Sequence, residues 1–288
     1  MRYALNLPTG GPCGDPATLA DFAELAERSG WDAVFVEDYI VYQGREDLPT
    51  HDPWIALAAM ATRTSRIRLG TMVTPLARRR PWKVAREATS LDHLSNGRVT
   101  LSVGLGDAST DSSFWKFKEE LDDRRRAAML DEALDIVAGL WTGEPFSYDG
   151  AHFKVDRVTF RPRPIQTPRI PIWVGGAYPN EGPMRRAARW DGANFYRAKT
   201  PGSAGDSGRG LTLDEFIRLR EYILSRRKTD APLDLVVHPQ RHPRSAESEV
   251  SRLRAFAEAG ASWSQVWIPP GERHQMESEI AVGPLLIV

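Results

Sequence analysis

The sequence lacks several features that would narrow its class. Cys13 is the single cysteine among 288 residues, so no disulfide forms within the chain and a thiolate zinc site is excluded. Lys plus Arg equals Asp plus Glu at 38 each, so net charge gives no bulk attraction to nucleic acid or to an anionic membrane. No apolar run approaches the ~20 residues of a membrane span, and the N-terminal residues lack the apolar core of a signal peptide. We therefore expect a cytoplasmic protein with neither nucleic acid nor a membrane as partner.

Sequence motifs for several kinds of catalysis are missing too. The six histidines show no H-x-H or H-E-x-x-H spacing, so we expect no metal. There is no Gly-x-Ser-x-Gly elbow and no Walker loop. These absences count against a barrel hydrolase or isomerase, which is one alternative for a chain of this length.

Short apolar runs alternate with helical patterns along the whole chain. Eight runs are typical of strands: 2–7, 32–37, 67–73, 98–106, 170–176, 192–196, 233–238 and 264–269. Helix-start signals lie between them, such as Asp15 and Asp52 before prolines and the capping-box pair Thr212 and Glu215. Eight strand–helix alternations predict an α/β fold, a parallel (β/α)8 TIM barrel. A doubly wound open sheet is the alternative, although its Gly-x-Gly-x-x-Gly motif is absent after the first strand.

Three segments stand out from this rhythm. Asp149-Gly150 lies between alternating residues and predicts a hairpin insertion, 146–164, after the fourth helix. The Gly/Ser-rich segment 200–210 predicts a mobile loop. A short helix is predicted from Met184 to Trp190. No internal repeat divides the chain, so we expect one domain over residues 1–288.

The loops that follow the strands build the active site of such a barrel, and that rule selects candidate residues by position. They are Glu37, Asp38, Tyr39, Thr74, Arg78, Arg79, Arg80, Gly104, Gly106, Asp107, Gly175, Gly176 and His238. Asp38 is a candidate hydrogen-bond acceptor or base, although carboxylates at strand ends also cap helices. His51 is a further candidate for catalysis by its placement.

The arginines Arg78 to Arg80 precede a proline that is placed to begin a helix. Cations near a helix N-terminus are normally unfavourable. Either carboxylates such as Glu87 or Asp107 pair with them, or an anionic ligand lies in front of the helix.

The paired glycines also have two interpretations. Gly175-Gly176 precedes a short helix, and glycines there let a phosphate approach backbone N–H groups, or they form a tight turn. Gly104 and Gly106 either leave room for a flat ring or shape a turn.

The ordered set of segments resembles the bacterial luciferase-like monooxygenase superfamily. The matching stretches are "GWDAVFVED", "DPWIALAAMATRTSRIRLGTMVTPLARRRPWKVAREATSLDHLSNGRVTLSVGLG", "MLDEALDIVAGLWTGEPFSYDGAHFKV" and "IPIWVGG…RRAARWDGANF". The resemblance runs from about residue 1 to 196. It implies a (β/α)8 barrel that uses reduced flavin (FMN) or the deazaflavin coenzyme F420 for monooxygenation or hydride transfer.

The resemblance also implies roles for residues. Met72-Val73 matches the place of a non-prolyl cis peptide that backs the tricyclic ring, and Asp38 matches a residue near the ring. Gly104 and Gly106 match the loop at the other edge of the ring. Gly175 and Gly176 match the segment that holds the cofactor phosphate, and Arg78 to Arg80 would then face the phosphate tail or an acidic substrate.

Tyr39 departs from the family pattern, because many deazaflavin members carry histidine there. A phenol of pKa ~10 donates hydrogen bonds but is a poor base. The departure slightly favours a flavin-dependent monooxygenase that uses reduced FMN and oxygen to act on a small organic substrate. A flavin reductase would supply the reduced FMN. A coenzyme F420-dependent hydride-transfer enzyme and a non-catalytic flavin-binding protein of the same fold are the alternatives, and family analogy suggests a homodimer.

Overall fold

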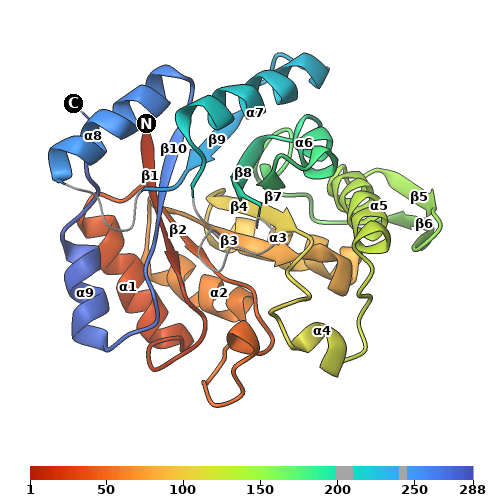
Figure 1. Ribbon diagram of the computed structural model, residues 1–288. Coiled ribbons are helices and arrows are strands. Elements are labelled where there is room, and N and C mark those ends of the chain that lie inside the picture. The colour runs from red at the N-terminus through yellow and green to blue at the C-terminus, as the bar shows by residue number, and fades with distance from the viewer. Residues whose placement is uncertain (199–209, 240–244, 288) are drawn as a thin grey trace.

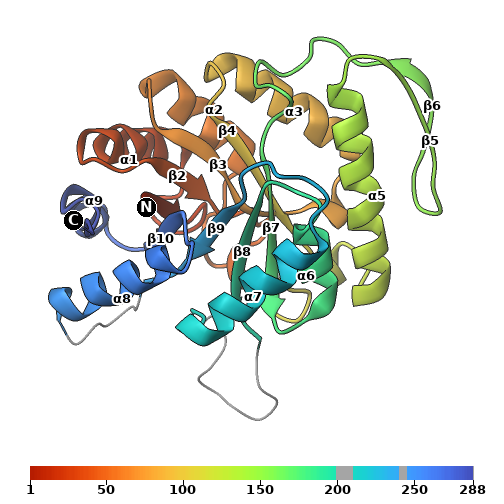
Figure 2. The same ribbon diagram turned by 90° about the horizontal axis from the view of Figure 1, so that it is seen from above.

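The computed structural model describes residues 1–198, 210–239 and 245–287. Parallel strands close into a barrel in the order β1, β10, β9, β8, β7, β4, β3, β2 (Figure 2). They are β1 (Arg2–Leu7), β2 (Ala33–Val36), β3 (Arg68–Pro75), β4 (Val99–Gly104), β7 (Ile172–Tyr178), β8 (Gly192–Arg197), β9 (Asp234–Val237) and β10 (Trp263–Trp267). The predicted (β/α)8 barrel is confirmed, and the open sheet is wrong because β1 pairs with both β2 and β10.

Helices surround the barrel (Figures 1 and 2). They are α1 (Pro16–Arg28), α2 (Pro53–Arg63), α3 (Pro81–Leu94), α4 (Ser113–Lys116), α5 (Asp123–Trp141), α6 (Glu181–Ala187), α7 (Leu213–Arg226), α8 (Ala246–Glu258) and α9 (Arg273–Ala281). Asp15 and Asp52 cap α1 and α2 as predicted, because each carboxylate accepts two N–H groups of the first turn. The capping box of Thr212 and Glu215 begins α7.

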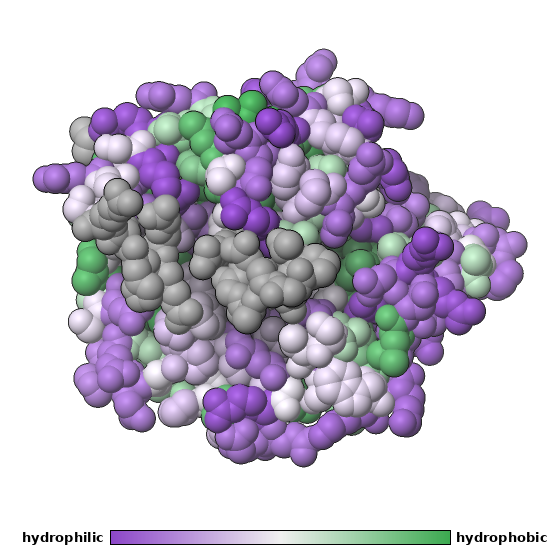
Figure 3. Space-filling model, in the orientation of Figure 1, coloured by the Kyte–Doolittle hydropathy of each residue, from purple (hydrophilic) through white to green (hydrophobic). Residues whose placement is uncertain are grey.

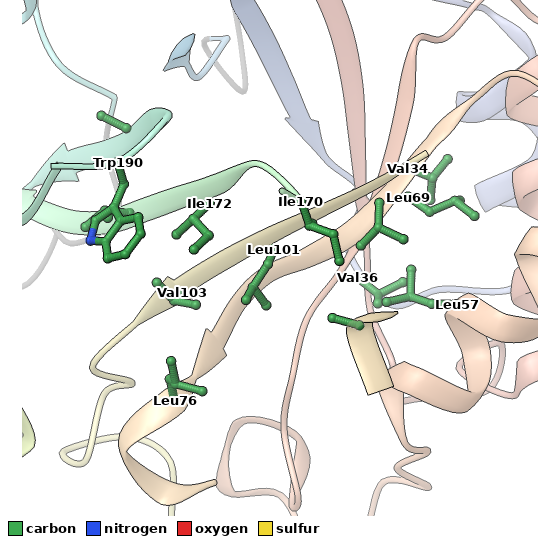
Figure 4. Close-up of a cluster of buried hydrophobic side chains, with 14 of the residues drawn as sticks. Val34, Val36, Leu57, Leu69, Leu76, Leu101, Val103, Ile170, Ile172 and Trp190 are labelled. Carbon is green, nitrogen blue, oxygen red and sulfur yellow. The ribbon is translucent and has the colours of Figure 1, made fainter. Parts of the chain in front are cut away.

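Strand alternation divides the apolar side chains into two cores. Val34 and Val36 of β2 belong to the large core between barrel and helices, which Figure 4 shows together with side chains from β3, β4 and β7. Ala33 and Phe35 of the same strand belong to a small cluster inside the barrel. That inner cluster is aromatic, with the rings of Phe35 and Trp173 5.2 Å apart and those of Trp173 and Trp263 5.3 Å apart. It fills the barrel from within and leaves polar side chains to line the mouth.

The structure corrects one helix boundary. The helix predicted at 184–190 is α6, which begins three residues earlier, at Glu181, and ends at Ala187. The N–H groups of Arg189 and Trp190 bond three residues back, to Arg186 and Ala187, because the chain tightens before it enters β8.

The hairpin that follows α5 is not part of the barrel. Strands β5 (Pro145–Asp149) and β6 (Lys154–Thr159) form an antiparallel pair within the predicted 146–164 hairpin, and Figure 2 shows it projecting beside α5. The predicted mobile loop, 200–210, lies outside the described residues except for Gly210. In the described part of the chain, no helix is long and apolar enough to cross a membrane.

Arg98 anchors the face of the barrel opposite the active-site loops. Its guanidinium donates to the carbonyls of Ala61, Thr64, Ile67 and Ser95 at 2.6–3.0 Å, and it is 8% exposed. Two of these carbonyls lie at the C-terminal end of α2, where helical carbonyls lack partners within the helix. One side chain therefore joins α2 to the starts of β3 and β4.

We predict that Arg98→Met lowers the free energy of unfolding by about 3 kcal/mol or more, because several buried carbonyls lose their donors. Urea unfolding followed by circular dichroism measures the change. The matched control is Arg66→Met, an exposed arginine in the same connection, with an expected change within about 0.5 kcal/mol. Equal effects of the two substitutions would contradict the anchoring role.

Candidate active site

Val73 occupies a cradle at the carboxyl ends of β3, β4 and β7. The peptide bond between Met72 and Val73 is cis, as the family resemblance implies. A Cβ atom on Gly104 would lie 2.8 Å from Val73 Cγ2, and a Cβ atom on Gly175 would lie 2.8 Å from Val73 Cγ1. Only glycine at both positions leaves room for this side chain. Val73, which the resemblance places behind a tricyclic ring, thus lies between two strands at the positions where each strand has a glycine.

The buried contacts of Arg78 explain its place in the cluster of arginines 78–80. Its side chain is 1% exposed and donates to Asp111 Oδ2 at 2.6 Å, to Ser113 Oγ at 2.9 Å and to the Asp38 carbonyl at 2.5 Å. Arg78 ends the short 3-10 helix η2 (Leu76–Arg78) after β3, while its partners follow β2 and β4. The guanidinium therefore fixes three neighbouring loops, which lie on the lower side of the barrel in Figure 1.

The other two arginines differ from Arg78 and from each other. Arg79 donates to Asp38 Oδ1 at 2.7 Å, so Asp38 has two cations on one oxygen. Arg80 is exposed, stands over the ring of Trp82 and has no ion pair among the described residues. Ion pairs with Asp38 and Asp111 thus account for Arg78 and Arg79, and the predicted carboxylate Glu87 acts on Arg79 as a nearby charge.

Three other predicted residues are explained locally by packing. Gly106 has φ +73°, and a Cβ atom there would lie 2.7 Å from Phe114, so the turn before α4 requires glycine. A Cβ atom on Gly176 would lie 2.5 Å from Pro183, so this glycine lets α6 approach the barrel. Thr74 is fully buried and donates to the Thr71 hydroxyl at 2.9 Å. Their predicted contacts with a cofactor remain predictions.

Tyr39 lies at the mouth beside other acidic and phenolic groups. Burial raises its pKa above the ordinary value, and the nearby carboxylates of Glu37, Asp111 and Asp107 raise it further. The pKa of Tyr196, at the end of β8, is raised mainly by burial. Both phenols keep their protons at neutral pH, so they act as hydrogen-bond donors and not as bases.

Glu37 directly follows β2 and is one of the candidates that the loop rule selected from the sequence. Tyr42, in the 3-10 helix η1 (Tyr42–Gly44), donates its hydroxyl to Glu37 Oε2 at 2.6 Å. The side chain of Trp267, at the end of β10, lies near Glu37. Burial raises the pKa of this carboxyl to about 7, and Tyr42 and Trp267 only partly oppose that rise.

A second polar group lies deeper in the mouth. His238 Nε2 is 2.7 Å from Asn194 Oδ1, and Asn194 Nδ2 donates to the sulfur of Met72 at 2.7 Å. Burial lowers the pKa of His238 to about 4, so the imidazole is neutral at physiological pH. The network ties Met72, the residue before Val73, to β8 and to the end of β9.

His51 is not brought to this group. Its N–H donates to the Thr9 carbonyl at 2.9 Å, its charge acts on Asp15, and no hydrogen bond joins it to Asp38 in the described residues. Its predicted catalytic role remains a prediction without support from these contacts. In the same described residues, no group of three or more His, Cys, Asp or Glu side chains is placed to hold a metal ion.

Among the described residues, a hollow on the surface is an alternative to the barrel mouth as the candidate site. The face in Figure 3 is mostly hydrophilic, with small separated hydrophobic patches. A surface hollow of about 580 Å³ lies between α1, α2 and α9, but Arg63 pairs there with Glu24, and Arg273 with Asp21. The charged groups in this hollow already have partners, so we place the candidate site at the barrel mouth.

A barrel whose mouth cradles Val73 and carries phenols, a buried carboxyl and a neutral imidazole is suited to bind a flat organic cofactor. The chain belongs to the luciferase-like monooxygenase family, whose model matches residues 3–195. It is 34% identical over 171 residues to an F420-dependent glucose-6-phosphate dehydrogenase of Nakamurella multipartita, which covers 57% of this chain and 48% of that protein. The chain thus spans about half the length of that relative.

Solved structures support the fold over nearly the whole chain. The coenzyme F420-dependent tetrahydromethanopterin reductase of Methanopyrus kandleri superposes with a TM-score of 0.74 at 15% identity, covering 98% of this chain and 96% of that one. The monooxygenase RslO1 of Streptomyces bottropensis gives 0.73 at 19% identity, covering 98% and 97%. At these identities the likeness establishes the barrel fold and no more.

We predict that Arg78→Met lowers the free energy of unfolding by about 3–5 kcal/mol, because it leaves Asp111 buried without its cation. Arg80→Met, two positions along the same run, should change it by no more than about 0.5 kcal/mol. Urea unfolding of both variants measures the contrast. A loss below 1 kcal/mol for Arg78→Met would show that this guanidinium does not hold the loops together.

Proposed function

We propose that the chain is a coenzyme F420-dependent oxidoreductase that transfers hydride to or from a small organic substrate. The observation that carries the proposal is the position of Val73 between Gly104 and Gly175. A methyl group added at either glycine would displace the Val73 side chain, against which a ring would pack. The relative from Nakamurella multipartita, whose name includes F420 dependence, favours the deazaflavin over the FMN predicted from the sequence.

A cation at the mouth, Arg80, agrees with the choice of the deazaflavin as cofactor. The tail of the deazaflavin is polyanionic, and Arg80 is an exposed cation without an ion pair in the described chain. Val73 and the two glycines would hold the ring, and Arg80 would attract the tail. When bound, the deazaflavin supplies a carbon that accepts or donates hydride.

The residues of this chain contribute position and proton handling. The Arg78 cluster keeps the loops after β2, β3 and β4 in fixed positions, so the site needs little reorganisation to bind. Tyr39 and Tyr196 remain protonated and offer hydrogen bonds to a substrate oxygen. Asp38 is occupied by Arg78 and Arg79, so we assign it to holding the loops and not to acting as the base.

We predict that the purified chain binds F420 at least about tenfold more tightly than FMN, measured by fluorescence titration at equilibrium. Gly104→Ala should weaken F420 binding by about tenfold or more, because its methyl group presses on Val73. The control is Gly182→Ala, where an added Cβ meets nothing within 4 Å.

The outcomes separate the alternatives. Tighter binding of FMN, with oxygen consumption by the reduced complex, would return the function to a flavin monooxygenase. Binding of F420 without hydride transfer to any substrate would favour a non-catalytic binding protein. Binding of neither would remove the proposed function and leave only the barrel.

A further inference from the structure

Hydride transfer at a carbon that bears oxygen also moves a proton, and the protein must supply a group that takes or gives it. The family histidine for such work is replaced by Tyr39 in this chain. We propose that Glu37 exchanges the proton with the oxygen of the bound substrate. This inference rests on the function proposed above and adds the residue that completes its chemistry.

The end of β2 places Glu37 near the cis peptide. Val36, the last residue of β2, is paired with Thr71 of β3, which directly precedes Met72. Ala33 and Phe35 of β2 belong to the inner cluster, and continued alternation would place Glu37 on the same side of the chain. Glu37 is half-buried.

Two successive carboxyl groups have opposite environments here. Asp38 Oδ1 accepts from Arg79 at 2.7 Å and has Arg78 at 3.4 Å. Among the described residues, Glu37 accepts from a neutral donor, the hydroxyl of Tyr42, and lies near the side chain of Trp267. Neighbouring titratable groups in such different environments are a recognised arrangement for acid–base chemistry.

The groups that face Glu37 are few. Tyr39 and Tyr42 stand on its own segment, 5.2 Å apart between ring centroids, and Trp267 approaches from β10. The cations Arg78, at the end of η2, and Arg79, which follows it, form ion pairs with Asp38 and Asp111. Burial without a cation raises the pKa of Glu37 to about 7, where a carboxyl both accepts and returns a proton efficiently at neutral pH.

Other groups at the mouth are less suited to this work. The pKa of Tyr39 is raised above its ordinary value, so its phenol does not ionise near neutral pH. The pKa of His238 is lowered to about 4, so its imidazole takes a proton only in acid. Asp107 is exposed and caps its own turn by accepting from Ser109 N at 3.0 Å.

For an alcohol substrate the step balances as follows. The carbinol hydrogen leaves with its bonding pair as hydride to the deazaflavin, the named oxidant. The O–H bond breaks, its electron pair forms the carbonyl bond, and the proton forms a new O–H bond on the Glu37 carboxylate. Glu37 then returns this proton to solvent. The carboxylate is the required form, so oxidation of the alcohol should accelerate as pH rises through about 7.

The first test uses the ligand-free full chain. We expect a carboxyl that titrates near pH 7 in ¹³C-glutamate NMR, absent in Glu37→Gln and retained in Glu132→Gln. Glu132 is a matched control because it is also half-buried, but it accepts backbone N–H groups of the hairpin turn. Tyr42→Phe should raise the titration midpoint of Glu37 further, because the hydrogen bond that favours its carboxylate form is lost. A midpoint near that of an ordinary glutamate, ~4.3, would overturn the proposal.

Unfolding gives a second signature with a fixed sign. The folded-state pKa of about 7 exceeds the ordinary value of 4.5. The contribution of Glu37 to the free energy of unfolding is therefore full below pH 4.5 and is lost as pH rises through 7. Glu37→Gln should remove this loss between pH 5 and 8, as urea unfolding measures.

The last test uses F420 with 2-propanol as the probe alcohol. We expect Glu37→Gln to retain F420 affinity, to lower kcat by about 10²–10⁴-fold and to abolish the rise of the oxidation rate near pH 7. An unchanged kcat with an unchanged pH dependence would overturn the role of Glu37. Failure of the proposed function looks different, because the wild-type chain then binds no F420.

Discussion

The buried guanidinium of Arg78 is the interaction on which the mouth of this barrel depends. It leaves η2 after β3 and reaches Asp38 after β2 and both Asp111 and Ser113 after β4. Loops after barrel strands are ordinarily the mobile part of the fold. Here one planar, permanently charged group fixes three of them. The position of Val73, Tyr39 and Glu37 relative to one another follows from that constraint.

The same constraint separates the roles of two adjacent carboxyl groups. Asp38 is held by Arg78 and Arg79 and belongs to the framework of the mouth. Glu37, the preceding residue, accepts from the neutral hydroxyl of Tyr42, and burial keeps its pKa raised to about 7. The mouth therefore carries a group that titrates near neutral pH one residue before the framework carboxylate.

Much of the fold followed from local signals in the sequence. The alternation of eight apolar runs with Asp15 and Asp52 as helix caps predicted the barrel, because these signals need only neighbouring residues. The partners of Arg78 could not be predicted in this way. Asp111 lies 33 residues away, in a loop whose conformation depends on Gly106 and on the packing of Phe114. The pKa of Glu37 likewise depends on Trp267, which only barrel closure brings near.

The central claim is that a deazaflavin binds against Val73 at the carboxyl ends of β3, β4 and β7. Hydrogen–deuterium exchange of the full chain with and without F420 tests it most directly. The account predicts slower exchange at residues 72–75, 104–106 and 174–177, with α1 and α9 unchanged. Slower exchange confined to the hollow between α1, α2 and α9, or unchanged exchange at the mouth despite saturating F420, would contradict the claim.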